Sequence, residues 1–290
     1  MSTKNEQETI HKKNLPYTIV YNTVRFAFQR FYKHIQVVGK ENIPFGDRFI
    51  FAPNHQNALM DALAVLFTCE KETVFMARAD IFKKKTQAKL LRFIKILPIY
   101  RIRDGASELT KNEEIFASAE TILGDHVPIC IMPEGNHGNK RRLRPLVKGV
   151  FRIAFRTHER FHDKKGVKIV PVGIDYSHYQ KFFQDLLVIY GEPIDVSEYY
   201  ESFKQNGPKG INELKKRLAS ELKKIIIHIE NEEFYNMYHH LREIYNKKMR
   251  MKTGILGRKH YDRFRADKQM IRILDERLKS HPDQVKELSE

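Results

Sequence analysis

The stretch RFIFAPNHQNALMDALAVLFT, residues 48–68, joins an apolar strand to an amphipathic helix. Phe49 to Ala52 form the short apolar run that is typical of a buried strand. The leucines that follow recur at helical spacing, which predicts a helix over residues 58–68. His55 therefore falls on the connection between the two elements.

Strands and helices continue to alternate after this stretch. The expected strands cover residues 49–52, 73–77, 97–101, 127–132, 168–174 and 186–190, and the expected helices cover residues 58–68, 82–96, 107–123 and 148–158. This alternation predicts an α/β fold, in which helices flank a mostly parallel central sheet.

Three regions are expected along the chain. Residues 1–35 form an N-terminal amphipathic helical segment, 36–207 a core domain and 208–290 a basic helical extension, with the last boundary at Gly207-Pro208. The N-terminal helix, expected over residues 17–35, combines an aromatic face with basic flanks. Such a helix either lies at a membrane interface or packs on the core, and the sequence leaves both interpretations open.

The composition is strongly basic. The 52 Lys and Arg against 36 Asp and Glu give a net charge of +16, about half of which lies in residues 246–279. This charge favours polyanionic partners, namely nucleic acid, an anionic membrane surface or phosphorylated substrates. Residues 1–14 do not resemble a signal peptide, and no apolar run is long enough to span a bilayer. We therefore expect a cytoplasmic protein, peripheral on the inner face of the membrane. Cys69 and Cys130 have no metal-ligand or redox spacing, so both are expected to be buried, reduced and structural.

His55 and Asp61 form a candidate general-base pair. With Asn57 as N-cap, Asp61 lies about one turn into the helix and leans back toward the loop that carries His55. The carboxylate can then orient one imidazole nitrogen while the other takes a proton from a hydroxyl group. The alternative is a surface histidine and an aspartate that stabilises the helix N-terminus.

Two basic stretches are candidate anion sites. After the strand at 127–132, the chain reads PEGNHGNKRRLR, residues 133–144, a glycine-flanked loop followed by cations. Its place at the carboxyl end of a strand favours phosphate binding over solvated surface. Arg101 and Arg103 stand at the end of the extended segment at 97–101 and just after it, and their alternating spacing can place both on one face. Two guanidinium groups on one face suit a phosphate monoester, although structural ion pairs would give the same pattern.

Four blocks in this order resemble those of the PlsC-type glycerolipid acyltransferase superfamily, whose members acylate glycerol phosphate and lysophosphatidate. The Asn-His and Asp of residues 54–61 resemble its first block, Pro98 to Arg101 its Pro-Ile-x-Arg block, Met132 to Gly138 its Phe-Pro-Glu-Gly-Thr-Arg-Ser block and Val170 to Val172 its Val-Pro-Val block. The resemblance covers roughly residues 35–195.

The chain departs from the family at two places. Five residues separate His55 from Asp61, where the family usually has four, and the loop is expected to absorb the extra one. His137 occupies the position of a phosphate-binding arginine, between Asn136 and Gly138 in place of threonine and serine. Either another arginine of the loop takes over the phosphate, or the acceptor is not the usual glycerol phosphate.

The resemblance implies an O-acyltransferase that moves an acyl group from a coenzyme A or acyl-carrier-protein thioester to a lysolipid-like hydroxyl. It implies His55 and Asp61 as catalytic residues and no metal or other cofactor. The residues expected to hold or shape the acceptor are Arg101, Arg103, Glu134, Gly135, His137, Lys140, Arg141, Arg142 and Arg144. There are two alternatives. The protein could bind nucleic acid through its basic C-terminal region, or it could be an inactive membrane-bound scaffold with this fold. No nucleic-acid-binding motif supports the first alternative.

Overall fold

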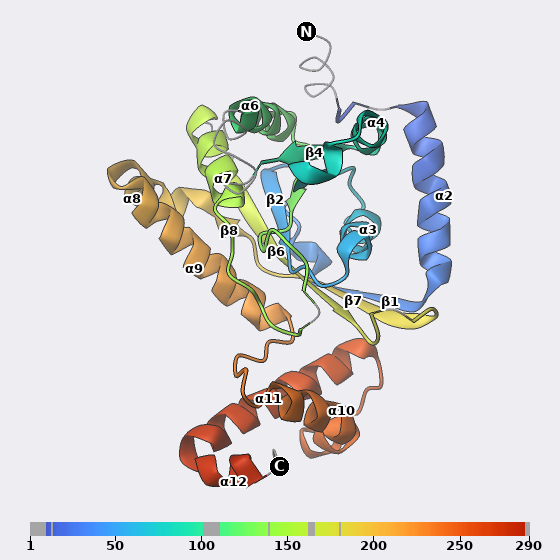
Figure 1. The fold of residues 1–290 in the computed structure, drawn as a ribbon, viewed down its shortest axis with the longest axis vertical. Helices are drawn as coiled ribbons and strands as arrows, with labels where there is room; N and C mark the ends of the chain where they lie inside the picture. Colours follow the sequence, from blue (N-terminus) through green and yellow to red (C-terminus); the bar gives the residue numbers. More distant parts are fainter. Residues whose placement is uncertain are drawn as a thin grey trace.

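A single mixed sheet forms the centre of the molecule (Figure 1). The computed structural model describes residues 10–12, 14–100, 111–138, 140–161, 166–179 and 181–287. Within them the sheet has eight strands, in the order β1-β7-β6-β2-β5-β3-β4, with β8 paired to β6. The strands are β1 (Tyr32–Val38), β2 (Arg48–Pro53), β3 (Val74–Arg78), β4 (Ile96–Ile99), β5 (Ile129–Ile131), β6 (Val167–Tyr176), β7 (Gln184–Tyr190) and β8 (Ile194–Asp195).

Most neighbouring strands run parallel. β2 pairs in parallel with β5 and β6, β3 with β4 and β5, and β1 with β7. The antiparallel pairs are β6 with β7 and β6 with β8. The prediction of a mostly parallel sheet is confirmed. Because β2 and β5 are parallel neighbours, the loops after their carboxyl ends meet at one edge of the sheet.

Helices cover both faces of the sheet. Helices α6, α7 and α9 pack over one face in a cluster that includes Ile115, Phe151 and Leu218, and α2 and α3 pack over the other with Phe28 and Val65. The helices are α2 (Leu15–Phe31), α3 (Ala58–Thr68), α4 (Lys85–Phe93), α6 (Lys111–Gly124), α7 (Gly149–Arg160), α8 (Tyr200–Gln205), α9 (Gly207–Ile225), α10 (Tyr235–Lys252), α11 (His260–Ser280) and α12 (Pro282–Glu287), with short 3₁₀ turns η1 (Lys40–Asn42), η2 (Ala79–Phe82) and η4 (Val196–Tyr199).

The N-terminal segment differs from its prediction. The helix expected to reach residue 35 ends at Phe31, and the chain continues as β1. Val37 of this strand lies opposite Val188 of β7. Pairing with a distant strand therefore decides the conformation of residues 32–38, and the expected boundary at 35 falls inside the sheet. Among the described helices, none is both long and apolar enough to cross a bilayer.

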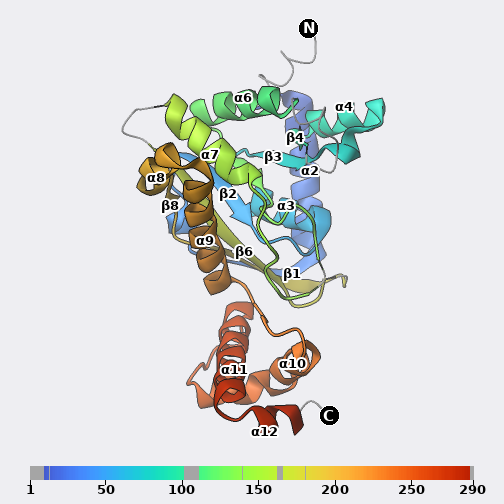
Figure 2. The same cartoon turned by 60° about the vertical axis from the view of Figure 1, so that its left-hand side comes forward.

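The C-terminal boundary also moves. Leu214, Leu218 and Leu222 of α9 lie in the core cluster over the sheet, so α9 belongs to the core and not to an extension that begins at 208. Helices α10, α11 and α12, named here the C-terminal unit, gather below the sheet (Figure 2). Phe234, Tyr238 and other residues of this region pack with Leu187 and Ile189 of β7.

Candidate active site

His55 lies on the loop from β2 to α3, and the residue before it anchors that loop. The Asn54 side chain donates to the carbonyl oxygen of Ile174 at 3.1 Å and accepts from the Ile174 amide at 2.7 Å. Asn54 is buried, so this pair of bonds satisfies its polar group inside the protein. The loop therefore leaves the sheet at a position fixed by β6.

His55 and Asp61 form the expected hydrogen bond. Nδ1 of His55 lies 2.9 Å from Oδ2 of Asp61, whose side chain is almost completely buried. The same oxygen accepts the amides of Gln56 at 2.8 Å and Asn57 at 2.7 Å, and Oδ1 accepts the hydroxyl of Tyr176 at 2.8 Å. Four donors hold one carboxylate, so its direction toward His55 is fixed.

The extra residue between His55 and Asp61 is absorbed at the start of α3. Asn57 is the N-cap of this helix, as expected, and Ala58 has a φ of +40°, which is unusual for a residue with a Cβ atom. The chain turns sharply there and the amides of Gln56 and Asn57 point at Asp61. The prediction that the loop can absorb this residue is confirmed.

The second imidazole nitrogen of His55, Nε2, is available to act as a base. A carboxylate at Nδ1 favours the tautomer with the proton on Nδ1, so Nε2 carries the lone pair. Within the described residues, Nε2 has no hydrogen-bond partner, and the side chain is 16% exposed. The arrangement can remove a proton from a hydroxyl group that approaches from solvent.

The cysteines are not placed to act as nucleophiles. Cys69 and Cys130 are buried and free, and burial raises the pKa of both thiols. A buried thiol with a raised pKa is a poor nucleophile. The expectation that both cysteines are buried and reduced is met.

Glu134 joins the two loops at this edge of the sheet. Its Oε1 accepts the His55 amide at 2.8 Å, and its Oε2 accepts both the backbone amide and Nε of Arg144 at 3.1 Å. Burial raises the pKa of Glu134, and these donors oppose the effect. Gly135 follows with a φ of +66°. Both residues shape the loop from within it.

The three arginines of the loop separate into different roles. Arg141 is 5% exposed, and its guanidinium pairs with Asp175 and donates to the Tyr176 carbonyl at 2.8 Å. This corrects the expectation that Arg141 binds the acceptor, because its donors are turned into the protein. Arg142 forms an ion pair with Glu232.

Arg144 is the arginine of this loop that lies against the His55 loop. A Cβ atom added to Gly138 would lie 3.3 Å from Nε of Arg144, and the Gly138 amide donates to the His55 carbonyl at 3.2 Å. Nη2 of Arg144 is buried without a hydrogen-bond partner among the described residues. Arg144 therefore has an unpaired guanidinium nitrogen next to the loop that carries His55.

His137 and Lys140 remain at the surface of this edge. The His137 ring is exposed and stands edge-on to the His55 ring, with 5.7 Å between their centroids. Lys140 is exposed, with Nζ 5.2 Å from the centroid of Tyr235. Arg101 and Arg103 lie outside the described residues, so their expected roles stay predictions.

Three residues of the site were not predicted from the sequence. Asn54 anchors the His55 loop to Ile174 of β6, and Tyr176 of β6 donates to Asp61. Arg78 donates to Asn136 at 2.9 Å, which brings a further cation to the third block. Tyr176 carried a usable signal, because the period of two in the predicted strand puts it on the same face as Ile174.

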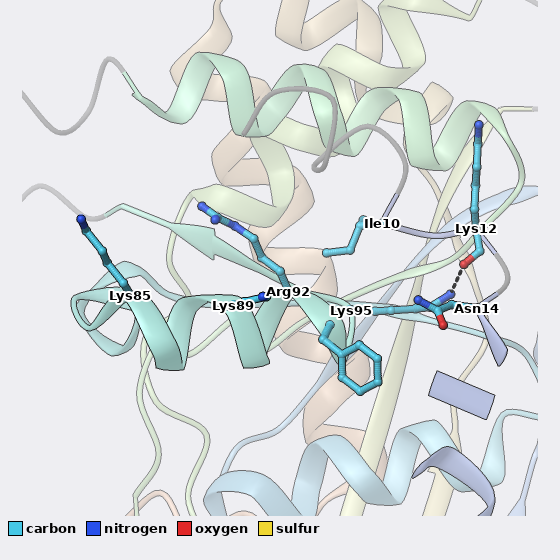
Figure 3. Close-up of a pocket in the computed structure, with 8 residues that line it drawn as sticks. Ile10, Lys12, Asn14, Lys85, Lys89, Arg92 and Lys95 are labelled. Atoms are coloured by element: carbon cyan, nitrogen blue, oxygen red, sulfur yellow. Dashed lines mark hydrogen bonds between the residues drawn. The ribbon is translucent and has the colours of Figure 1, made fainter. Parts of the chain in front are cut away.

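A basic hollow lies elsewhere in the protein. It measures about 520 Å³ and is lined by Ile10, Lys12, Asn14, Lys85, Lys89, Arg92, Phe93 and Lys95 (Figure 3). Lys95 directly precedes β4, so the hollow reaches the amino-terminal edge of the parallel strands, opposite the edge that carries His55. It is not the site of the His55 chemistry. Within the described part of the chain, no group of three or more His, Cys, Asp or Glu side chains is arranged to hold a metal ion.

Two curated proteins of Saccharomyces cerevisiae are similar to part of this chain. Glycerol-3-phosphate O-acyltransferase 2 is 31% identical over 117 residues, which is 40% of this chain and 16% of that protein. Glycerol-3-phosphate O-acyltransferase 1 is 38% identical over 68 residues, 23% of this chain and 9% of that protein. The matched segment is thus a small part of each relative.

A solved structure is also similar. The 1-acyl-sn-glycerophosphate acyltransferase PlsC of Thermotoga maritima aligns with 69% of this chain and 79% of its own, at 19% identity and a TM-score of 0.44. The family model described as Acyltransferase matches residues 34–175, a range that contains His55, Asp61 and the loop of Glu134. Residues 34–175 therefore carry an acyltransferase-family domain, which supports the resemblance of this region to the PlsC-type glycerolipid acyltransferases.

Proposed function

We propose that this protein transfers an acyl group from an acyl thioester to the hydroxyl of a glycerophosphate-like or lysolipid acceptor, with His55 as general base. The observation that carries the proposal is the 2.9 Å contact between Nδ1 of His55 and Oδ2 of Asp61, which leaves Nε2 without a hydrogen-bond partner among the described residues on a side chain that is 16% exposed. Glycerolipid acyl transfer is the activity of the superfamily; the thioester donor and the roles of His55 and Asp61 are what we propose for this chain.

In the proposed reaction, Nε2 of His55 takes the hydroxyl proton while the oxygen attacks the thioester carbonyl. Asp61 stabilises the imidazolium that forms. The tetrahedral intermediate then expels the thiolate, which takes the proton back from Nε2. The acceptor gains an ester, the carrier leaves as a free thiol, and His55 returns to its starting state. The protein needs no nucleophile of its own because the acceptor supplies one.

The acceptor head group is proposed to lie over the loop of residues 134–144. Arg144 offers guanidinium nitrogens beside the His55 loop, and the exposed His137 ring adds a second donor. An arginine can bind a phosphate through two parallel hydrogen bonds, whereas a histidine contributes one. This supports an anionic acceptor held by Arg144 in place of the family arginine.

The test is an acceptor panel with a common acyl thioester. Glycerol 3-phosphate, lysophosphatidate and a phosphate-free lysolipid are compared, and release of the free thiol is followed. The wild type should acylate at least one acceptor, and His55→Ala should lose transfer by about 10²- to 10⁴-fold, the usual contribution of a general base. His240→Ala, at an exposed histidine on α10, is the control. Full activity in His55→Ala would refute the mechanism.

The protein is also proposed to dock on an anionic membrane surface through the outer face of α2. Tyr17 and Phe28 of this helix are buried, so one face packs on the core. The opposite face exposes Leu15, Ile19 and Phe26, at 74%, 61% and 61% of their surfaces. One face of α2 thus packs on the core, and the opposite face is the one that we propose for the membrane.

Cations and further apolar side chains continue this surface. α4 lies near the N-terminal end of α2, and the turn between β6 and β7 lies near its C-terminal end (Figure 1). α4 exposes Leu90 and Lys89, and the turn exposes Phe182 and Phe183. Apolar side chains bordered by lysines fit an interface with anionic lipid.

Sedimentation with vesicles tests the docking surface. Vesicles of phosphatidylcholine are compared with vesicles that also contain phosphatidylglycerol, and the second kind should retain more protein. Ile19→Glu and Phe26→Glu should release it, whereas Ile244→Glu, at an exposed site on α10, should not. Equal retention of all variants would contradict the surface, and salt-sensitive binding to nucleic acid without vesicle binding would favour the nucleic-acid alternative.

A further inference from the structure

The C-terminal unit and the segment before it hold the loop that carries Glu134 and Arg144. The amide of Ile229 donates to the Arg141 carbonyl at 2.9 Å, and the Arg141 amide donates to the Tyr235 hydroxyl at 2.8 Å. The amide of Leu143 donates to Nδ1 of His228 at 3.0 Å. His228, Ile229 and Tyr235 lie beyond residue 175, where the family match ends.

A buried charge cluster continues this contact to the sheet. Asp175, near the end of β6, pairs with Arg141 through one oxygen and lies 2.7 Å from Nε2 of His260 through the other. All three residues are less than 10% exposed. Burial alone would raise the pKa of Asp175, but the Arg141 charge and the His260 hydrogen bond hold that pKa well below its usual value. Asp175 is therefore a fixed anion.

The next residue points to the other face of the sheet. Side chains alternate along a strand, so Asp175 faces the C-terminal unit while Tyr176 enters the cluster beneath α2 and α3. There the Tyr176 hydroxyl donates to Oδ1 of Asp61 at 2.8 Å. Burial and the Asp61 charge raise the pKa of Tyr176 well above 10.0, so the hydroxyl stays a donor. Arg141 also binds the Tyr176 carbonyl at 2.8 Å.

From this geometry we infer that His260, the first residue of α11, is a positioning residue for the His55–Asp61 pair. It fixes Asp175, and Asp175 fixes the strand end from which Tyr176 reaches Asp61. The inference rests on the proposed function for its kinetic consequence. It gives the C-terminal unit a part in the active site, although none of its residues touches the reacting atoms.

The test is a double-mutant cycle between His260 and Tyr176. His260→Asn cannot reach Asp175, whereas His260→Gln places its amide nitrogen where Nε2 lies and should restore the bond. Tyr176→Phe is expected to lower kcat about 10-fold, a loss typical of one hydrogen bond to a charged group. His260→Asn should lower kcat by about 3- to 10-fold, His260→Gln by less than about twofold, and the matched control His240→Asn not at all.

Coupling decides the outcome. If His260 acts through Tyr176, the double variant His260→Asn with Tyr176→Phe should be no slower than Tyr176→Phe alone, and the KM for the thioester should not change. Multiplied losses, or wild-type kcat in His260→Asn, would overturn the inference. Thermal unfolding of each variant identifies any loss that comes from misfolding.

A readout without catalysis separates this inference from the proposed function. The Nδ1 proton of His55, bonded to a carboxylate, should give a downfield proton resonance that disappears in His55→Ala. We expect this resonance to shift or broaden in His260→Asn and to return in His260→Gln. If no acceptor is acylated but the resonance responds this way, the proposed function fails and the positioning role stands; an unchanged resonance in His260→Asn overturns the role.

Discussion

Replacing Asp61 with asparagine should remove charge from the catalytic pair without moving it. Oδ2 of Asp61 accepts three N–H groups, whereas Oδ1 faces the Tyr176 hydroxyl. The amide oxygen of the asparagine should take the place of Oδ2, where it can accept from all three N–H groups. An amide nitrogen in that place would point its own hydrogens at theirs. The amide nitrogen then faces the Tyr176 oxygen, which can accept as well as donate. The structure therefore predicts one orientation of the amide and an unchanged His55 tautomer.

The rate should fall because the imidazolium loses its counter-charge. Opposite charges about 4 Å apart attract by about 4 kcal/mol at an effective dielectric constant of about 20. A barrier raised by about 1.4 kcal/mol slows a reaction about tenfold, so Asp61→Asn should lower kcat by up to about 10³-fold. The loss should stay smaller than that of a variant in which His55 is also turned, such as Asp61→Ala, where two backbone amides lose their acceptor.

Thiol release at saturating thioester and acceptor measures this effect, and thermal unfolding checks the fold. The expected result is a folded Asp61→Asn protein with a large loss of kcat and little change in KM. A folded variant within about tenfold of wild-type kcat would refute the argument, because His55 would then need no counter-charge in the transition state. An unfolded variant would instead show that the predicted amide orientation does not form.

Three further substitutions test the scaffold of the site. Gly135 has a φ of +66°, and a Cβ atom added there would lie 3.1 Å from a methyl group, so Gly135→Ala should lower the free energy of unfolding by more than the roughly 1–2 kcal/mol of left-handed strain. Gly254 has a similar φ of +69° but lies in open space, so Gly254→Ala should lower it by the strain alone. Urea unfolding measures both. Arg141→Gln should destabilise the fold by about 3–5 kcal/mol because Asp175 is left buried without its main partner, and a variant as stable as wild type would contradict the structural role. Burial lowers the pKa of His228 from 6.5 to about 4, so between these pH values the proton binds to the unfolded chain but not to the folded one. The free energy of unfolding should therefore fall as the pH drops from about 6.5 to 4. Unfolding curves at several pH values should show this slope in the wild type and a flatter one in His228→Asn.

The hydrophobic periodicity of the sequence predicted those elements whose own apolar residues mark the buried face. The helix predicted over residues 58–68 has those bounds in the structure, and the apolar runs at 49–52 and 186–190 are strands. The strand at 32–38 was missed because its register depends on β7, about 150 residues away. A local pattern carries no information on such a partner.

Charge identity alone could not assign the arginines of the loop. Arg141 and Arg144 follow the same block three residues apart, and the sequence offers no reason to separate them. Their roles are set by distant carboxylates, because Asp175 draws Arg141 inward from β6 and Glu134 keeps Arg144 beside the His55 loop. The partner that neutralises each cation decides which one remains for a ligand.

The extra residue between His55 and Asp61 bears on what the block spacing means. A residue with a Cβ atom in the left-handed region costs about 1–2 kcal/mol, and Ala58 holds this conformation because the amides before it are bound by the Asp61 carboxylate. The pair keeps its hydrogen bond at a different residue count. In this chain, the direction of the Asp61 carboxylate toward His55 is kept although the number of residues between them differs from the family's usual four.

The His55 loop is also tied to its surroundings through Gln56, the residue that follows His55. The Gln56 side chain donates to the Lys140 carbonyl at 3.0 Å and accepts the hydroxyl of Tyr179, which lies after β6. The loop that carries the base is thus tied to the loop that carries the cations and to the turn that reaches α2. Because β6 bears both Asp175 and Tyr176, every contact that orients Asp61 from outside its own loop passes through the end of this one strand. The geometry of the base therefore depends on Tyr176, which lies after residue 175, in addition to the block that contains His55.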